Sequence, residues 1–149
     1  MTRSPEQRKS DALAKLTEKG ANIWVASASP IGAVHLIPVS HSWNGSHVVV
    51  ATEPESRTVT NVITNGRVRL ALGETRDVIV IDAVLAESVP VAQSTADLAD
   101  AYAAQAGWDP RTDGGDYVYL VFNPNRILVW QEGEDLTGRT IMNNGTWLI

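Results

Sequence analysis

The residues best placed to do chemistry lie in the segment EPESRTVTNVITNG, which runs between the β-runs VVVAT and RVRLAL. A short helix beginning near Ser56 would present unpaired backbone N–H groups and partial positive charge at its start. The Arg57 guanidinium and the hydroxyls of Ser56 and Thr58 would gather around an anion there. The pattern therefore predicts a phosphate site, with a phosphate-bearing cofactor as the leading candidate ligand. An ordinary N-capped surface helix is the alternative, because Ser is among the commonest N-caps.

The histidines His35, His41 and His47 are the residues that could hold a metal ion. On one strand His35 and His41 would lie roughly 20 Å apart, at about 3.3 Å per residue. A two-residue turn at the Asn-Gly step 44–45 would pair His47 with Ser42, on the opposite sheet face from His41. We therefore expect no shared metal site, and we assign these histidines surface or hydrogen-bonding roles.

Other catalytic patterns are absent from the chain. The sequence has no G-x-S-x-G elbow, no carboxylate pair in a context typical of glycosidases, and no G-x-G-x-x-G fingerprint. It also has no Cys, which excludes disulfides, thiolate catalysis and Cys-ligated metals. A cofactor that carries the reactive chemistry would explain why no catalytic constellation stands out.

Three helices are expected to accompany the strands. Ser4 reads as an N-cap with Pro5 at the first helical position and Gln7 closing a capping box, and Gly20 would end this first helix. The second helix follows Ser56 and stops at an Asn-Gly step. The third, at about 92–106, places Leu98, Tyr102 and Ala106 on one stripe.

Short β-runs fill most of the remaining chain. They cover 21–29, 32–43, 46–52, 67–72, 77–89, 117–122 and 126–132, with turns expected at Asn44-Gly45 and Pro124-Asn125. Their meander order predicts a mainly β (α+β) fold, an antiparallel barrel closed or nearly closed, with a two-sheet sandwich as the alternative.

Length and charge limit the range of functions. The 149 residues fit one domain, 1–149, and the net charge of −5 comes from 17 acidic and 12 dispersed basic residues. We expect no nucleic-acid partner. The polar N-terminal segment lacks an apolar h-region, and no run reaches the roughly 18 apolar residues of a membrane span. A soluble, cytoplasmic protein is therefore expected.

Trp43, Trp130 and Trp147 fall at the ends of predicted elements. Aromatic residues in such places either pack into the core or contact another subunit, so a dimer is one expectation. Arg67 and Arg69 alternate with apolar residues, so at least one of them should face outward. Arg67 could neutralise an anion from a partner subunit.

The segment 35–85 resembles the pyridoxamine 5'-phosphate oxidase-like family of FMN and deazaflavin split-barrel proteins, including its actinobacterial members. The likeness covers roughly two thirds of the chain and depends on the order and spacing of several motifs. These are Ala51-Thr52, Ser56-Arg57-Thr58, Asn61, Arg67-Val68-Arg69-Leu70, the strand from Asp77, and Gly138-Arg139.

The resemblance implies a split-barrel homodimer with the cofactor at the subunit interface. The ring of FMN or of the deazaflavin coenzyme F-420 would lie along one strand, and its phosphate would sit at the start of the second helix. The cofactor-binding residues so implied are His35, Leu36, Ile37, Pro38, Val39 and Ser40 for the ring, Ala51, Thr52, Ser56, Arg57, Thr58 and Asn61 around the phosphate, and Asp77 beside the ring.

Two departures from the family pattern affect the cofactor. Thr58 stands where relatives carry a Lys, and Asp77 stands where oxidase-type relatives carry a ring-binding Gln. Both leave the choice between FMN and F-420 open. The residues that grip pyridoxamine phosphate in the oxidase are not recognisable in the C-terminal third.

Together these features predict an oxidoreductase that transfers hydride between FMN or coenzyme F-420 and a small unsaturated substrate. A non-enzymatic carrier of a flavin-like or tetrapyrrole ligand is the alternative of a different class, since some relatives bind haem or bilins. A third alternative is a barrel that serves only as an interaction module.

Overall fold

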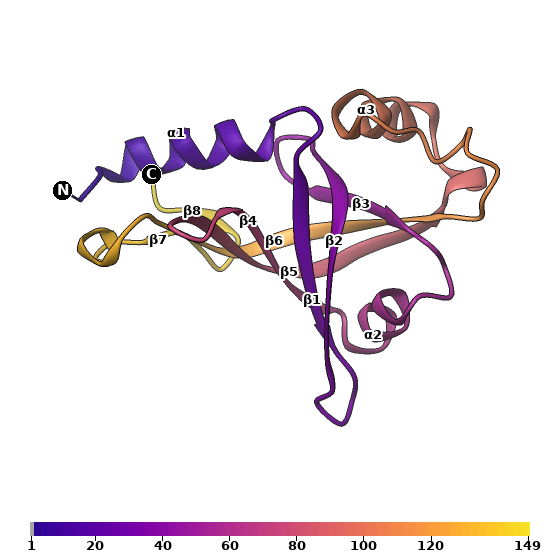
Figure 1. Cartoon of the computed structure of the whole chain (residues 1–149), viewed down its shortest axis with the longest axis horizontal. Coiled ribbons are helices and arrows are strands. Elements are labelled where there is room, and N and C mark those ends of the chain that lie inside the picture. Colours follow the sequence, from indigo (N-terminus) through magenta and orange to yellow (C-terminus); the bar gives the residue numbers. More distant parts are fainter. Residues whose placement is uncertain (1) are drawn as a thin grey trace.

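The computed structural model describes residues 2–149, which form one antiparallel β-barrel with helices at its ends and along one side (Figure 1). Its elements are α1 (Pro5–Leu16), β1 (Asn22–Ala28), β2 (Val34–Trp43), β3 (Val48–Thr52), α2 (Arg57–Asn65), β4 (Arg67–Glu74), β5 (Asp77–Pro90), η1 (Val91–Gln93), α3 (Ala96–Ala106), β6 (Val118–Trp130), η2 (Gly133–Asp135), β7 (Thr140–Asn143) and β8 (Thr146–Trp147).

Six strands close the barrel. The sheet order is β3-β2-β1-β4-β5-β6, and β3 also pairs with β6, while β7 and β8 extend the sheet beyond β6. The alternation within the strands explains the closed core: Val68, Leu70 and Leu72 of β4 are buried, whereas the intervening Arg67 and Arg69 are exposed. The predicted α+β barrel is therefore confirmed, and the sandwich alternative is wrong.

The three helices cover different parts of the barrel. Ala12 and Leu16 of α1 and Val59 and Val62 of α2 join the main core, and the two helices lie at different ends of the molecule (Figure 1). A second apolar cluster lies under α3, where Tyr102 packs with Tyr119. The outer sides of β3 and of the first half of β6 are therefore covered by α3.

The outer side of β1, β4 and the first half of β2 carries no helix. Cross-strand neighbours there form a row that runs from β2 to β6: Pro38, Trp24, Ala71, Val80 and Leu128. The adjacent part of β2 adds Val34 and Leu36. We refer to this surface, defined by Trp24, Ala26, Val34, Leu36, Pro38, Ala71 and Val80, as the open face.

Two expected turns are wrong, for local reasons. The β2–β3 turn centres on Gly45-Ser46 instead of Asn44-Gly45, because Trp43 pairs with Val48. Gly45 has a positive φ and Asn44 does not, whereas the predicted type I′ turn needs a positive φ at both. His47 is thus opposite Asn44, not Ser42. The Pro124-Asn125 step makes no turn, because β6 continues through it with a bulge that leaves Asn125 without a partner on β5.

Helix ends follow the predictions with three exceptions. Ser4 caps α1 as expected, but the Gln7 side chain donates to Asp11 instead of closing a capping box, and Thr17 ends the helix before Gly20 is reached. The helix expected at 92–106 is split, with η1 first and α3 beginning after its cap, Thr95.

Candidate functional site

The start of α2 has the geometry expected of an anion site. The Ser56 hydroxyl accepts a hydrogen bond from the Val59 N–H at 3.3 Å, and the Ser56 carbonyl accepts one from the Thr60 N–H at 3.1 Å. Within residues 2–149 no hydrogen bond uses the N–H groups of Arg57 and Thr58. Arg57 is itself exposed and has no ion-pair partner in that range. One guanidinium and two free backbone donors therefore meet at this helix end.

The side chains of Thr58 and Asn61 point into the protein instead. Thr58 is 1% exposed, and its hydroxyl has no hydrogen-bond partner among the described residues. The Asn61 amide donates to the Ser27 hydroxyl of β1 at 3.1 Å, and Ser27 in turn lies opposite His35 on β2. Asn61 therefore joins α2 to β1, and only the backbone N–H of Thr58 remains available to an anion.

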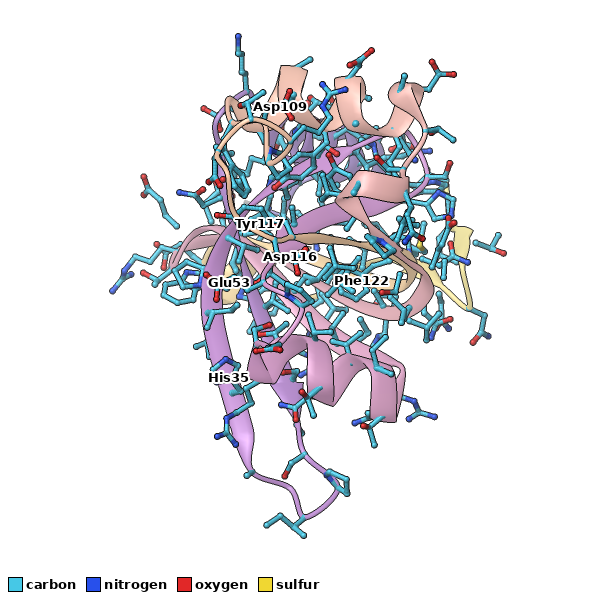
Figure 2. The ribbon with its side chains drawn as sticks, turned by 90° about the vertical axis from the view of Figure 1, so that its right-hand side faces the viewer. His35, Glu53, Asp109, Asp116, Tyr117 and Phe122 are labelled. Carbon is cyan, nitrogen blue, oxygen red and sulfur yellow. The ribbon has the colours of Figure 1, made fainter. Side chains whose placement is uncertain are left out.

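The loop that precedes α2 borders an acidic cavity. This cavity, of about 290 Å³, is lined by Glu53, Pro54, Glu55, Gly115, Asp116 and Tyr117. Figure 2 shows Glu53, Asp116 and Tyr117 gathered between α2 and α3, with His35 farther along β2. Three carboxylates in one small cavity repel anions, so this cavity does not extend the candidate anion site at the start of α2.

Residues 35–40 of β2, predicted to lie along the cofactor ring, alternate between the core and the outer surface. His35, Ile37 and Val39 are half-buried, and Ile37 and Val39 pack against the main core, whereas Leu36 and Pro38 face outward on the open face. Residues 34–40 pair only with β1, because the pairing with β3 starts at His41. The other edge of this segment therefore has free backbone groups.

Ser40, Ala51 and Thr52 lie near the covered side of the barrel. The Ser40 carbonyl accepts a hydrogen bond from the Tyr102 hydroxyl of α3 at 3.2 Å. Ala51 is buried in the cluster under α3, and Thr52 is half-buried at the end of β3. Of these residues only Thr52 lies next to the loop that leads to α2.

Asp77 lies apart from the other predicted site residues. It pairs with Glu74 at the turn between β4 and β5, and its carboxylate contacts Lys15 Nζ of α1 at 2.6 Å. Since α2 leads directly into β4 at Arg67, the length of β4 separates the two places by more than about 20 Å. Within one chain Asp77 therefore does not reach a ligand held by Arg57.

The histidines occupy three different environments. His41 is fully buried, and its Nε2 lies 3.0 Å from the Leu16 carbonyl oxygen. His47 lies beside Asn44 in the β2–β3 turn, and His35 is half-buried on β2. No cluster of three metal-ligating side chains occurs among residues 2–149.

A feature that was only partly foreseen lies where β4 begins. Arg67 and Arg69 are both exposed, and both line two adjoining cavities of about 520 and 200 Å³ on the outer side of the sheet. The Arg-x-Arg alternation predicts that at least one of the two side chains faces outward. It could not indicate a cavity, which depends on neighbouring strands and on the bulge at Asn125.

The fold belongs to the split-barrel class. Among solved structures, it is similar to an F420 reductase (TM-score 0.63, 16% identity, 76% of this chain and 94% of that one). It is also similar to a putative pyridoxamine 5'-phosphate oxidase from Listeria innocua (TM-score 0.61, 13% identity, 81% and 96%). A heme binding protein from Mycobacterium smegmatis has a TM-score of 0.64 and 15% identity, with 97% of this chain and 60% of that one covered.

These likenesses confirm the split-barrel fold that the sequence resemblance implied. No family model and no curated protein matches the chain. No helix in residues 2–149 has the length and apolar character that crossing a membrane requires.

Proposed function

We propose that the protein is a homodimeric oxidoreductase that binds FMN or coenzyme F-420 and transfers hydride to or from a small unsaturated substrate. The observation that carries this proposal is the exposed Arg57 with two free N–H groups at the start of α2, on a split barrel whose open face is apolar. The anionic tail of such a cofactor would bind Arg57 and the free N–H groups, and its planar ring would lie against the apolar open face.

The open face supports the dimer. Trp24 is 47% exposed, Leu36 56% and Val34 78%, and they lie on two neighbouring strands. Adjacent apolar side chains of this size favour association, because covering them removes apolar area from water. A second copy that covers this face would also enclose a cofactor at its edge.

The outward side of β2 suits the cofactor ring. Leu36 and Pro38 offer a flat apolar surface, and the unpaired edge of residues 34–40 offers backbone donors and acceptors to the polar rim of a flavin or deazaflavin. Arg57 and the N–H groups of Arg57 and Thr58 would hold the phosphate. Bound there, the cofactor supplies the hydride chemistry, while the chain positions the ring and excludes water.

The test is a titration of the purified protein with FMN and with F-420, followed by fluorescence. We expect one of the two to bind, and Arg57→Ala to weaken that binding at least about tenfold, the loss of a charge-assisted phosphate contact. Arg76→Ala is the control, since Arg76 is an exposed cation in the β4–β5 turn. Equal affinity in wild type and Arg57→Ala would overturn the anchor assignment.

A second measurement separates the enzyme from the carrier alternative. Turnover of the reduced cofactor with an added acceptor would support the oxidoreductase. Tight binding of FMN, F-420 or haem without turnover would support a carrier, and a protein that binds none of the three would refute both.

A further inference from the structure

The start of β4 carries a cation that the proposed cofactor site does not use. Arg67 and Arg69 point to the same outer side of the sheet, because they are two residues apart on one strand. Arg69 forms an ion pair with Asp82, because its Nε and Nη2 donate to the two carboxylate oxygens at 2.6 and 3.2 Å. Arg67 is opposite Val84 and has no ion-pair partner within residues 2–149.

The two cavities beside these arginines meet to form one groove. The larger one, about 520 Å³, lies between β4, β5 and the β6 bulge and is lined by Arg67, Arg69, Asp82, Val84 and Asn125. The smaller one, about 200 Å³, continues over Ala26, Ala28 and Val34. We refer to the two together as the Arg67 groove.

The charge of the Arg67 groove is positive even though the chain as a whole is acidic. Two arginines, Arg67 and Arg69, line the groove with one carboxylate, Asp82, and Arg126 is opposite Asp82 on the β5–β6 pair outside that lining. An anion bound beside Arg67 would therefore feel a local field opposite in sign to that of the whole protein. Asn125, freed by the bulge from pairing with β5, adds an exposed amide at the same end.

The other end of the Arg67 groove is apolar and continues onto the open face. Val34 and Ala28 are cross-strand neighbours, as are Leu36 and Ala26. A ligand that fills the groove must therefore combine an apolar body with a negatively charged group. The groove is also continuous with the outward side of β2, where the proposed cofactor ring lies.

We propose that the Arg67 groove binds a small organic anion, with its carboxylate or phosphate on the Arg67 guanidinium and its apolar body against Ala26, Ala28 and Val34. The anion site needs no cofactor, but its apolar end, Ala26 and Val34, also belongs to the open face, so a dimer formed through that face would enclose the bound anion. Its interpretation as the substrate site rests on the proposed function, and it makes the substrate class an unsaturated organic acid or phosphate ester.

The experiment measures binding by calorimetry without any cofactor, using 4-phenylbutyrate and phenyl phosphate as probes and neutral 4-phenylbutanol for comparison. We expect both anions to bind more tightly than the alcohol and Arg67→Gln to weaken the anions roughly tenfold while leaving the alcohol unchanged. Asp82→Asn frees Arg69 and should strengthen anion binding. Arg76→Gln, which makes the same change in charge at the other end of β4, should have no effect.

Several results would overturn the site: no preference for the anions in wild type, equal affinities in wild type and Arg67→Gln, or weaker anion binding in Asp82→Asn. The FMN and F-420 titrations are then repeated on Arg67→Gln. Unchanged cofactor affinity supports a separate substrate site, whereas a loss equal to that of Arg57→Ala would assign the groove to the cofactor and overturn the substrate interpretation. Failure of the Arg57 test alone would leave the anion result standing.

Discussion

Arg8 and Asp135 form a buried ion pair, with Nη2 3.0 Å from Oδ1, that joins the first helix to the turn before β7. The Arg8 guanidinium also donates to the carbonyls of Val129 and Thr137 at 2.9 and 2.7 Å. Arg3 binds the second Asp135 oxygen at 2.7 Å. All three charged groups are thus held by partners far away in sequence.

Removing the Asp135 charge should destabilise the protein strongly. Asp135→Asn leaves the Arg8 guanidinium, 1% exposed, without its counter-charge, and we expect a loss of about 3–5 kcal/mol in the free energy of unfolding, measured in urea. Asp11→Asn is the control, because Asp11 meets Arg3 in a more exposed place and should cost no more than about 1 kcal/mol. Similar losses for both variants would contradict the buried-pair interpretation.

The same carboxylate should govern stability in acid. Burial raises the pKa of Asp135, but hydrogen bonds from the Arg3 and Gln131 N–H groups and the ion pair with Arg3 outweigh this effect and bring it to about 2. Because the folded pKa lies below the ordinary 3.8, this stabilisation is complete above about pH 4 and is lost as the pH falls toward 2. Acid unfolding followed by circular dichroism should begin at higher pH in Asp135→Asn.

His41 should produce a separate pH dependence at milder acidity. Burial lowers the pKa of His41 below its ordinary 6.5, and the hydrogen bond with the Leu16 carbonyl offsets this only in part. The unfolded chain therefore takes up the proton more readily, so stability is highest above pH 6.5 and declines as the pH falls below it. We expect the urea midpoint to fall between pH 7 and pH 5 in wild type but to change less in His41→Gln. Parallel curves for the two proteins would rule out this role.

Gly73 should be intolerant of a side chain. Its φ is +89°, and a Cβ there would clash with the Asp77 carbonyl oxygen. Gly73→Ala should lose more stability than Gly20→Ala, which has a similar φ of +78° but open space around it. The backbone cost of Ala at the left-handed φ of Gly20 is about 1–2 kcal/mol, so comparing the thermal unfolding of the two variants isolates the contact. Equal losses would show that the Asp77 backbone yields.

The open face should control the oligomeric state. Leu36→Asp places a charge where the proposed dimer interface is apolar, and sedimentation velocity should show a monomer. Ile63→Asp on α2 is matched to it, since both side chains are 56% exposed, and it should leave the dimer intact. A Leu36→Asp protein that sediments like wild type would place the interface elsewhere.

The sequence was most informative where local chemistry decides the structure. Ser56 caps α2, Gly66 ends it with a left-handed φ, and the strands on either side follow the alternation of apolar residues. The Asn44-Gly45 turn failed because the adjacent Gly45-Ser46 step also offers a glycine with positive φ, and the tertiary pairing of β3 decided between them.

The site was harder to predict, because side-chain direction depends on packing. Thr58 faces inward because α2 buries one side against β1, so a predicted phosphate ligand is a core residue. Asp77 is distant because β4 runs its full length before the chain turns back. The Arg67 groove requires strands β1, β4, β5 and β6 together, so no local motif could predict it.

Closure of the barrel by β3 and β6 has a kinetic consequence. Val50 pairs with Leu120, so this seam joins strands that lie far apart in the chain. Long-range pairing of this kind slows folding, because loop entropy is lost before the contacts form. During synthesis the edge of β3 that pairs with β6 stays unpaired until β6 has left the ribosome. Stopped-flow refolding should therefore reveal this seam as the slowest step, and crowded nascent chains would be most vulnerable to mispairing just before it forms.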